Sequence, residues 1–128
     1  MENKPNNSFN NRQDEDKKLV LYYIRKKVEK GTGLKFPELI EKYNQEQLFN
    51  IGLKHVTTTK KAICVALNIP VEGACRYKRK AETKGLLVQS FNKMVCPYTS
   101  NFAHVLSTNP NEFFRLSKIN QLNLFDDE

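Results

Sequence analysis

The chain has 128 residues, of which 39% are hydrophobic, enough for one small domain with a modest core. Its 21 Lys and Arg side chains outnumber its 14 Asp and Glu side chains, so the net charge is +7 and the isoelectric point is near 9.4. This balance favours a polyanionic partner such as DNA, RNA or an anionic membrane surface, although it is also compatible with charge that serves solubility alone. No run of about 20 apolar residues is present to span a membrane, and Met1–Gln13 lacks the apolar core of a signal peptide.

The cysteines and histidines do not form a metal or redox motif. Cys64, Cys75 and Cys96 are too widely spaced for a Cys-x-x-Cys pair, and neither His55 nor His104 stands at a ligand spacing from a cysteine or a carboxylate. No nucleophile-elbow, phosphate-loop or zinc-protease motif is present either. We therefore expect no metal, no cofactor and no enzymatic activity. The cysteine pattern also fits a reducing compartment, so we expect a cytoplasmic protein, associated with the nucleoid if it binds DNA.

The N-terminal third predicts an arm followed by two helices. Residues 1–14 are rich in Asn and nearly devoid of apolar side chains, which predicts a disordered arm. Val20, Ile24 and Val28 recur at helical spacing and predict a helix over residues 15–30 that ends at Gly31.

A second, shorter helix is expected to start at Pro37 and to run through Tyr43. Residues 44–54 are ambiguous between a continuing helix and a loop around Gly52. In either case Leu48 and Phe49 are expected to reach the core.

Residues 57–85 predict two short helices joined by a tight turn, which is the geometry of a helix-turn-helix. Thr57 and Thr58 offer oxygens that can cap the first helix. Pro70 prevents that helix from continuing, and Asn68 suits the left-handed conformation of a tight turn. The second helix is expected from residue 71 to about residue 84, and Gly85 ends it.

The residues after Gly85 have strand composition. Residues 86–90 and 94–96 predict a β-hairpin that turns at Asn92 and Lys93, with Pro97 closing its second strand. A hairpin in this position is where a winged helix carries its wing. The predicted fold is therefore mainly α with a small β-hairpin wing, over a domain of residues 15–108.

The segment from Leu67 to Leu87 resembles the winged helix-turn-helix superfamily of bacterial DNA-binding regulators. That pattern has Leu-Gly-Ile-Pro at the turn, a central Arg in the second helix and then Leu-Glu-x-x-Gly-Leu. The matching residues here are Leu67, Ile69, Pro70, Arg76, Glu82, Gly85 and Leu86. The chain departs from the pattern at Glu72 and Gly73, which replace a Ser-Thr pair, and at Lys78 and Ala81, which replace core leucines; Tyr77 with Ala74 and Ala81 is expected to fill that role.

This resemblance implies binding of double-stranded DNA through the second helix and the wing. Arg76 and Arg79, one helical turn apart, are expected in the major groove. Lys60 and Lys61 are expected on the phosphate backbone, and Lys93 at the wing tip is expected to reach a neighbouring minor groove or phosphates. The full set of expected DNA contacts is Thr58, Lys60, Lys61, Glu72, Gly73, Arg76, Arg79, Lys80 and Lys93.

Residues 109–128 predict a helix followed by a tail. Asn109, Pro110 and Glu112 form a helix start, and the first and last helices of the chain are candidates for a homodimer contact. The tail Gln121-Leu-Asn-Leu-Phe125 resembles the peptide with which bacterial replication and repair proteins dock onto the DNA polymerase sliding clamp. That resemblance implies that Gln121, Leu122, Leu124 and Phe125 bind the clamp. Packing of the same apolar residues onto the domain is the alternative.

Two functions remain open at this stage. The first is a DNA-binding module that serves as a transcriptional regulator or as an accessory factor in replication or in a mobile element. The second is a protein-protein interaction module that keeps the winged scaffold without reading DNA; Glu72 and Gly73 favour it because a carboxylate at that helix start repels phosphate.

Overall fold

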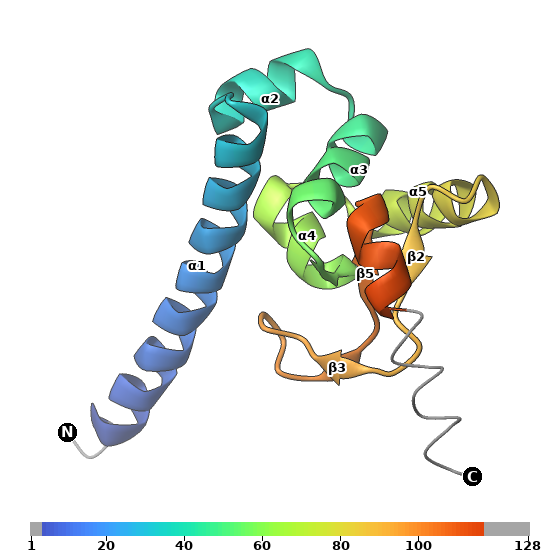
Figure 1. Cartoon of the computed structure of the whole chain (residues 1–128). Helices are drawn as coiled ribbons and strands as arrows, with labels where there is room; N and C mark the ends of the chain where they lie inside the picture. Colours follow the sequence, from blue (N-terminus) through green and yellow to red (C-terminus); the bar gives the residue numbers. More distant parts are fainter. Residues whose placement is uncertain (1–3, 117–128) are drawn as a thin grey trace, which may run out of the picture.

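A computed structural model describes residues 4–116 of the chain (Figure 1). These residues form a mainly helical fold with a small antiparallel sheet, as the sequence predicts at that level. In chain order the elements are α1 (Lys4–Thr32), α2 (Phe36–Lys42), α3 (Gln45–His55), β1 (Thr58–Thr59), α4 (Lys60–Leu67), α5 (Val71–Thr83), β2 (Val88–Gln89), β3 (Met94–Val95), β4 (Phe102–Ala103) and β5 (Val105–Ser107). Residues 110–116 form a further helical segment.

Helix α1 is longer than the sequence pattern predicts. It begins at Lys4, so the prediction of a disordered arm over residues 1–14 is wrong from Lys4 onward. Ile24 and Val28 are buried and fix the C-terminal half of α1 against the core. Because extension of an existing helix adds one hydrogen bond per residue without a new nucleation cost, the helix continues through a segment whose composition alone does not favour order.

Helices α2 and α3 both begin at the residues that their capping patterns require. The second helix is present as predicted, but it runs over Phe36–Lys42, one residue earlier at each end than expected. Helix α3 resolves the ambiguity of residues 44–54 in favour of a helix. Asn44 caps α3 by accepting a hydrogen bond from the Gln47 amide at 2.8 Å. Within α3, position 52 requires glycine, because a Cβ there would stand 2.6 Å from Leu67 Cδ1. The glycine lets α3 and α4 approach more closely than a larger residue would allow.

Helices α4 and α5 form the predicted pair of short helices with a tight turn. Asn68 ends α4 in the left-handed conformation at φ 58°, as predicted, and Gly85 follows α5 at φ 75°. The cap of α4 is Thr59, whose hydroxyl accepts from the Ala62 amide at 3.3 Å. The prediction that Thr57 or Thr58 caps this helix is therefore wrong, because α4 begins at Lys60 and the residue directly before it is Thr59.

The strands after α5 pair differently from the predicted hairpin. Strand β2 pairs with β5, and β3 pairs with β4, so residues 86–90 do not pair with residues 94–96. The chain bends at Phe91 and Asn92, where the Ser90 hydroxyl donates to the Asn92 carbonyl at 2.7 Å, and continues outward. It reverses only at residues 97–101, where the Cys96 amide donates to the Asn101 carbonyl at 2.7 Å.

We call residues 88–107 the ribbon. Its base joins β1 in a three-stranded sheet of order β1-β5-β2, with Thr58 opposite Leu106 and Gln89 opposite the same Leu106. Its outer part is the β3-β4 pair, in which Met94 lies opposite Ala103 and Val95 opposite Phe102. Lys93 is therefore partway along the first arm of the ribbon and not at its tip, which corrects the predicted position.

The hydrophobic core lies between α1, α3, α4 and α5. Its largest fully buried side chains include Phe49 and Leu53 of α3, Ile63 and Leu67 of α4, and Leu106 of β5. Helix α1 packs against α3 and α4 on one side, and α5 packs against the other side (Figure 1). This arrangement leaves the outward face of α5 and the ribbon at the edge of the molecule.

The helical residues 110–116 pack onto the domain. Asn109 caps this segment, since its side-chain oxygen accepts from the Asn111 amide at 3.0 Å, as predicted. The preceding Thr108 donates its hydroxyl to the Asn50 carbonyl at 2.6 Å, and Leu116 is fully buried. The last described turn is therefore part of the domain surface next to α3.

Candidate nucleic-acid interface

Helix α5 has one face anchored in the protein and one face directed outward. Gly73, Ala74 and Ala81 are buried, whereas Arg76 and Arg79 are exposed. The two arginines are three residues apart and so lie on the same side of the helix. No carboxylate in the described part of the chain pairs with either guanidinium.

Tyr77 fills the position that the missing leucines leave open. Its ring packs against Phe49 of α3 with a centroid separation of 6.1 Å, and its hydroxyl donates to Gln45 Oε1 at 3.4 Å. The sequence predicts this role for Tyr77. Because α5 is held through an aromatic contact and small residues, its cationic face stays free for a ligand.

Two of the predicted contact residues are not available on this surface. Gly73 is buried, and a Cβ there would lie 3.3 Å from the Tyr77 hydroxyl, so this position faces the protein. The Thr58 hydroxyl is buried and has no hydrogen-bond partner within residues 4–116. Glu72, in contrast, is exposed in the first turn of α5, as a contact residue must be.

Some of the positive charge of α5 is neutralised within the protein. Lys78 Nζ lies 3.2 Å from Glu82 Oε1 on the same helix. Lys80 Nζ lies 3.3 Å from Glu46 Oε2 of α3, which reduces the expected contribution of Lys80 to anion binding. The positive charges of α5 that remain available to an anion are therefore those of Arg76 and Arg79. The exposed Lys84, which follows the last residue of α5, adds a third.

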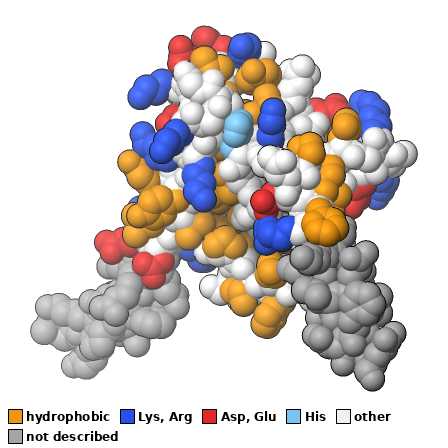
Figure 2. Space-filling model, in the orientation of Figure 1, with side chains coloured by type: hydrophobic (Ala, Val, Ile, Leu, Met, Phe, Trp, Pro, Cys, Tyr) orange, Lys and Arg blue, Asp and Glu red, His pale blue; other side chains and the backbone are white. Residues whose placement is uncertain are grey.

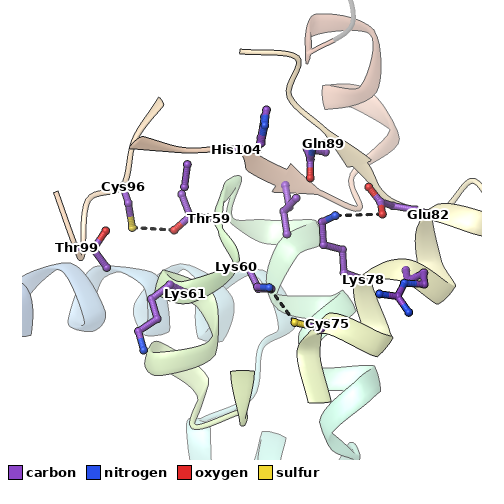
Figure 3. Close-up of a pocket in the computed structure, with 13 residues that line it drawn as sticks. Thr59, Lys60, Lys61, Cys75, Lys78, Glu82, Gln89, Cys96, Thr99 and His104 are labelled. Atoms are coloured by element: carbon purple, nitrogen blue, oxygen red, sulfur yellow. Dashed lines mark hydrogen bonds and ion pairs between the residues drawn. The ribbon is translucent and has the colours of Figure 1, made fainter. Parts of the chain in front are cut away.

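A cleft of about 410 Å³ runs between α5, the start of α4 and the ribbon (Figure 3). We call it the cationic cleft, because four cations line it against one carboxylate, which belongs to Glu82: Lys60, Lys61, Lys78 and Arg79. The ribbon contributes Gln89, Ala103 and His104 to the opposite wall. The volume and the charge of this cleft suit a phosphate group.

The ribbon side of the cleft is the part that the sequence interpretation missed. Gln89 and His104 come from strands whose pairing is set by the tertiary structure, so no local motif marks them. One signal was present: no Asp or Glu stands between Glu82 and Glu112. This acid-free stretch contains the whole ribbon, so the ribbon brings no negative charge to the cleft.

The cationic cleft also sets the reactivity of Cys75. Lys60 Nζ donates a hydrogen bond to Cys75 Sγ at 3.0 Å, and this bond, with the nearby positive charges of Lys60, Arg79 and Lys78, lowers the pKa of the thiol. Burial acts in the opposite direction on Cys64, whose pKa is raised to about 11. Burial also raises the pKa of Cys96, but hydrogen bonds from Thr59 and Thr99 outweigh that effect and lower it.

Cys75 is therefore expected to react first with iodoacetamide. The thiolate is the reacting form, and Cys75 combines a lowered pKa with an accessible position, whereas Cys64 and Cys96 are buried. Alkylation rates followed across pH by peptide mass spectrometry should show Cys75 reacting at a lower pH than Cys64. In the variant Lys60→Met the pH midpoint for Cys75 should rise. Equal rates for Cys75 and Cys64 would contradict the assigned hydrogen bond.

The remaining predicted residues fall in three classes. Lys60 and Lys61 are both at the cationic cleft, and Lys93 is exposed on the first arm of the ribbon. The predicted clamp-binding residues Gln121, Leu122, Leu124 and Phe125 lie outside residues 4–116, so the clamp interaction stays a prediction.

Comparisons of the chain with protein-family models, with curated proteins and with solved structures find no match. Among the described residues, no helix combines the length and the apolar character needed to cross a bilayer. The same residues contain no cluster of three His, Cys, Asp or Glu side chains that is arranged to hold a metal ion.

Proposed function

We propose that this chain is a winged helix-turn-helix protein that binds double-stranded DNA. The order α4, turn, α5 and then a β-ribbon supports the fold assignment, as does the pairing of β1, β5 and β2 in one sheet beside the two helices. In this arrangement α5 enters the major groove, and the ribbon contacts the flanking backbone.

The observation that carries the proposal is the outward position of Arg76 and Arg79 beside the cationic cleft. Their guanidinium groups have the fork geometry that pairs with guanine edges or with phosphate oxygens. Lys60 and Lys61 continue the positive surface from α5 to the start of α4. Four cations from two segments, α5 and the start of α4, are therefore available to one polyanion.

The test is a titration of duplex DNA at several salt concentrations, followed by fluorescence anisotropy. If these four cations each neutralise a phosphate, the logarithm of the binding constant should fall against the logarithm of salt with a slope of about −4. A slope near zero, or no binding at low salt, would contradict DNA binding.

The second candidate is a protein-protein interaction module on the same scaffold. The exposed carboxylate of Glu72 at the start of α5 favours it, because that is the end of the helix that a phosphate backbone would approach. This alternative predicts no salt-dependent affinity for duplex DNA, so the same titration separates the two functions.

A further inference from the structure

The β3-β4 part of the ribbon has two different faces. Side chains opposite each other in an antiparallel pair lie on the same face, and neighbours along a strand alternate between faces. Ala103, opposite Met94, lines the cationic cleft. Val95 and Phe102, which form the next pair, therefore lie on the face directed away from the cleft.

Several large apolar side chains of the ribbon are exposed. Phe102 is 71% exposed, Val95 is 57% exposed, and Phe91 on the same arm as Val95 is 56% exposed. Figure 2 shows hydrophobic side chains gathered at the lower edge of the molecule, where Figure 1 places β3. A patch of exposed rings and aliphatic groups of this kind marks a contact surface.

The charge of the ribbon indicates the chemistry of its partner. The ribbon contains Lys93 and no carboxylate, and its inner face is a wall of the cationic cleft. Exposed aromatic rings next to a cationic groove are the features with which proteins hold unstacked bases, since a ring stacks on a base while cations follow the backbone. The apolar face and the cationic cleft thus lie on opposite sides of the same short ribbon.

We propose that the ribbon binds DNA where its two strands separate, with the phosphates of one strand in the cationic cleft and an unpaired base stacked on Phe102. This inference rests on the proposed DNA-binding function and adds the class of DNA structure. The two faces explain the preference, because a ribbon with the cationic cleft of α4 and α5 on one side and an aromatic ring on the other fits between diverging strands. Continuous duplex offers no unstacked base to the outer face.

The experiment compares three labelled DNAs by fluorescence anisotropy at one salt concentration: a blunt duplex, the same duplex with two non-complementary thymine arms, and a thymine single strand. The full chain should bind the forked DNA about tenfold more tightly than the blunt duplex, as expected for one stacked base. Phe102→Ala should abolish most of that preference. It should leave the salt dependence unchanged, because no phosphate contact is removed.

The matched control is Tyr23→Ala, which removes a ring of α1 that is 64% exposed and should leave the preference for forked DNA intact. Salt-dependent binding with equal affinity for blunt and forked DNA would overturn the inference while the proposed function stands. Forked-DNA binding that Phe102→Ala leaves unchanged would also overturn it and would assign the apolar face to a protein partner. Absence of binding to all three DNAs would instead remove the proposed function itself.

Discussion

Simultaneous replacement of Arg76 and Arg79 by alanine should weaken duplex binding by about 30-fold at the least. Each arginine that pairs with a base edge contributes about 1–3 kcal/mol, so the loss of two gives at least about 2 kcal/mol. Both side chains are exposed on α5, and no described carboxylate holds them in the free protein. Fluorescence anisotropy with duplex DNA at moderate salt measures the change.

The control for this variant must remove the same charge elsewhere. Lys27 and Lys30 are exposed on α1, on the other side of α3 and α4 from α5 (Figure 1). Lys27→Ala with Lys30→Ala lowers the net charge by the same two units, so it reports the effect of overall charge alone. If both double variants lose affinity equally, or if the arginine variant binds like the parent, α5 is not the DNA-facing helix.

The elements that the sequence predicts correctly are those determined by residues close together in the chain. Asn68 and Pro70 fix the turn between α4 and α5, and Gly85 fixes the end of α5, because each residue acts through its own backbone preference. Such preferences can be interpreted from a few adjacent residues. The helix pair and the outward position of Arg76 and Arg79 follow from them together with the apolar spacing.

The ribbon was mispredicted because strand pairing is a property of distant residues. Residues 86–90 and 94–96 have the composition of a hairpin, but Val88 and Gln89 pair with Ser107 and Leu106 instead. The start of α4 at Lys60 also changed the role of Thr58, since a helix is capped by the residue directly before it. The chain places Thr58 inside the sheet and leaves the capping of α4 to Thr59.

The candidate site also has a part that the sequence predicts and a part that only the structure reveals. The cations of α4 and α5 are visible in the sequence, and the Lys78–Glu82 pair follows from its i,i+4 spacing. The pairing of Lys80 with Glu46 joins two helices that are far apart in the chain, so only the structure reveals that this lysine is partly neutralised. The same holds for His104 and Gln89, which complete the cationic cleft.

Replacement of Phe49 by alanine should lower the free energy of unfolding by about 3–5 kcal/mol. Phe49 is fully buried in α3, and its removal leaves a cavity between α3 and the Tyr77 ring of α5. A domain of this size is stable by about 5–15 kcal/mol, so the variant loses at least about a fifth of that margin. Urea unfolding followed by circular dichroism gives the value.

The same loss of packing should reach the proposed DNA-binding surface, because the contact between Phe49 and Tyr77 is one of the anchors that hold α5 in position. Phe49→Ala should therefore weaken duplex binding even where most of the protein remains folded. Phe102→Ala is the matched control for stability, since that ring is 71% exposed and its removal should change the free energy of unfolding by less than about 0.5 kcal/mol. A Phe49→Ala variant as stable as the Phe102→Ala variant would mean that α3 and α5 do not share this core contact, and the cationic face of α5 would then have no fixed support.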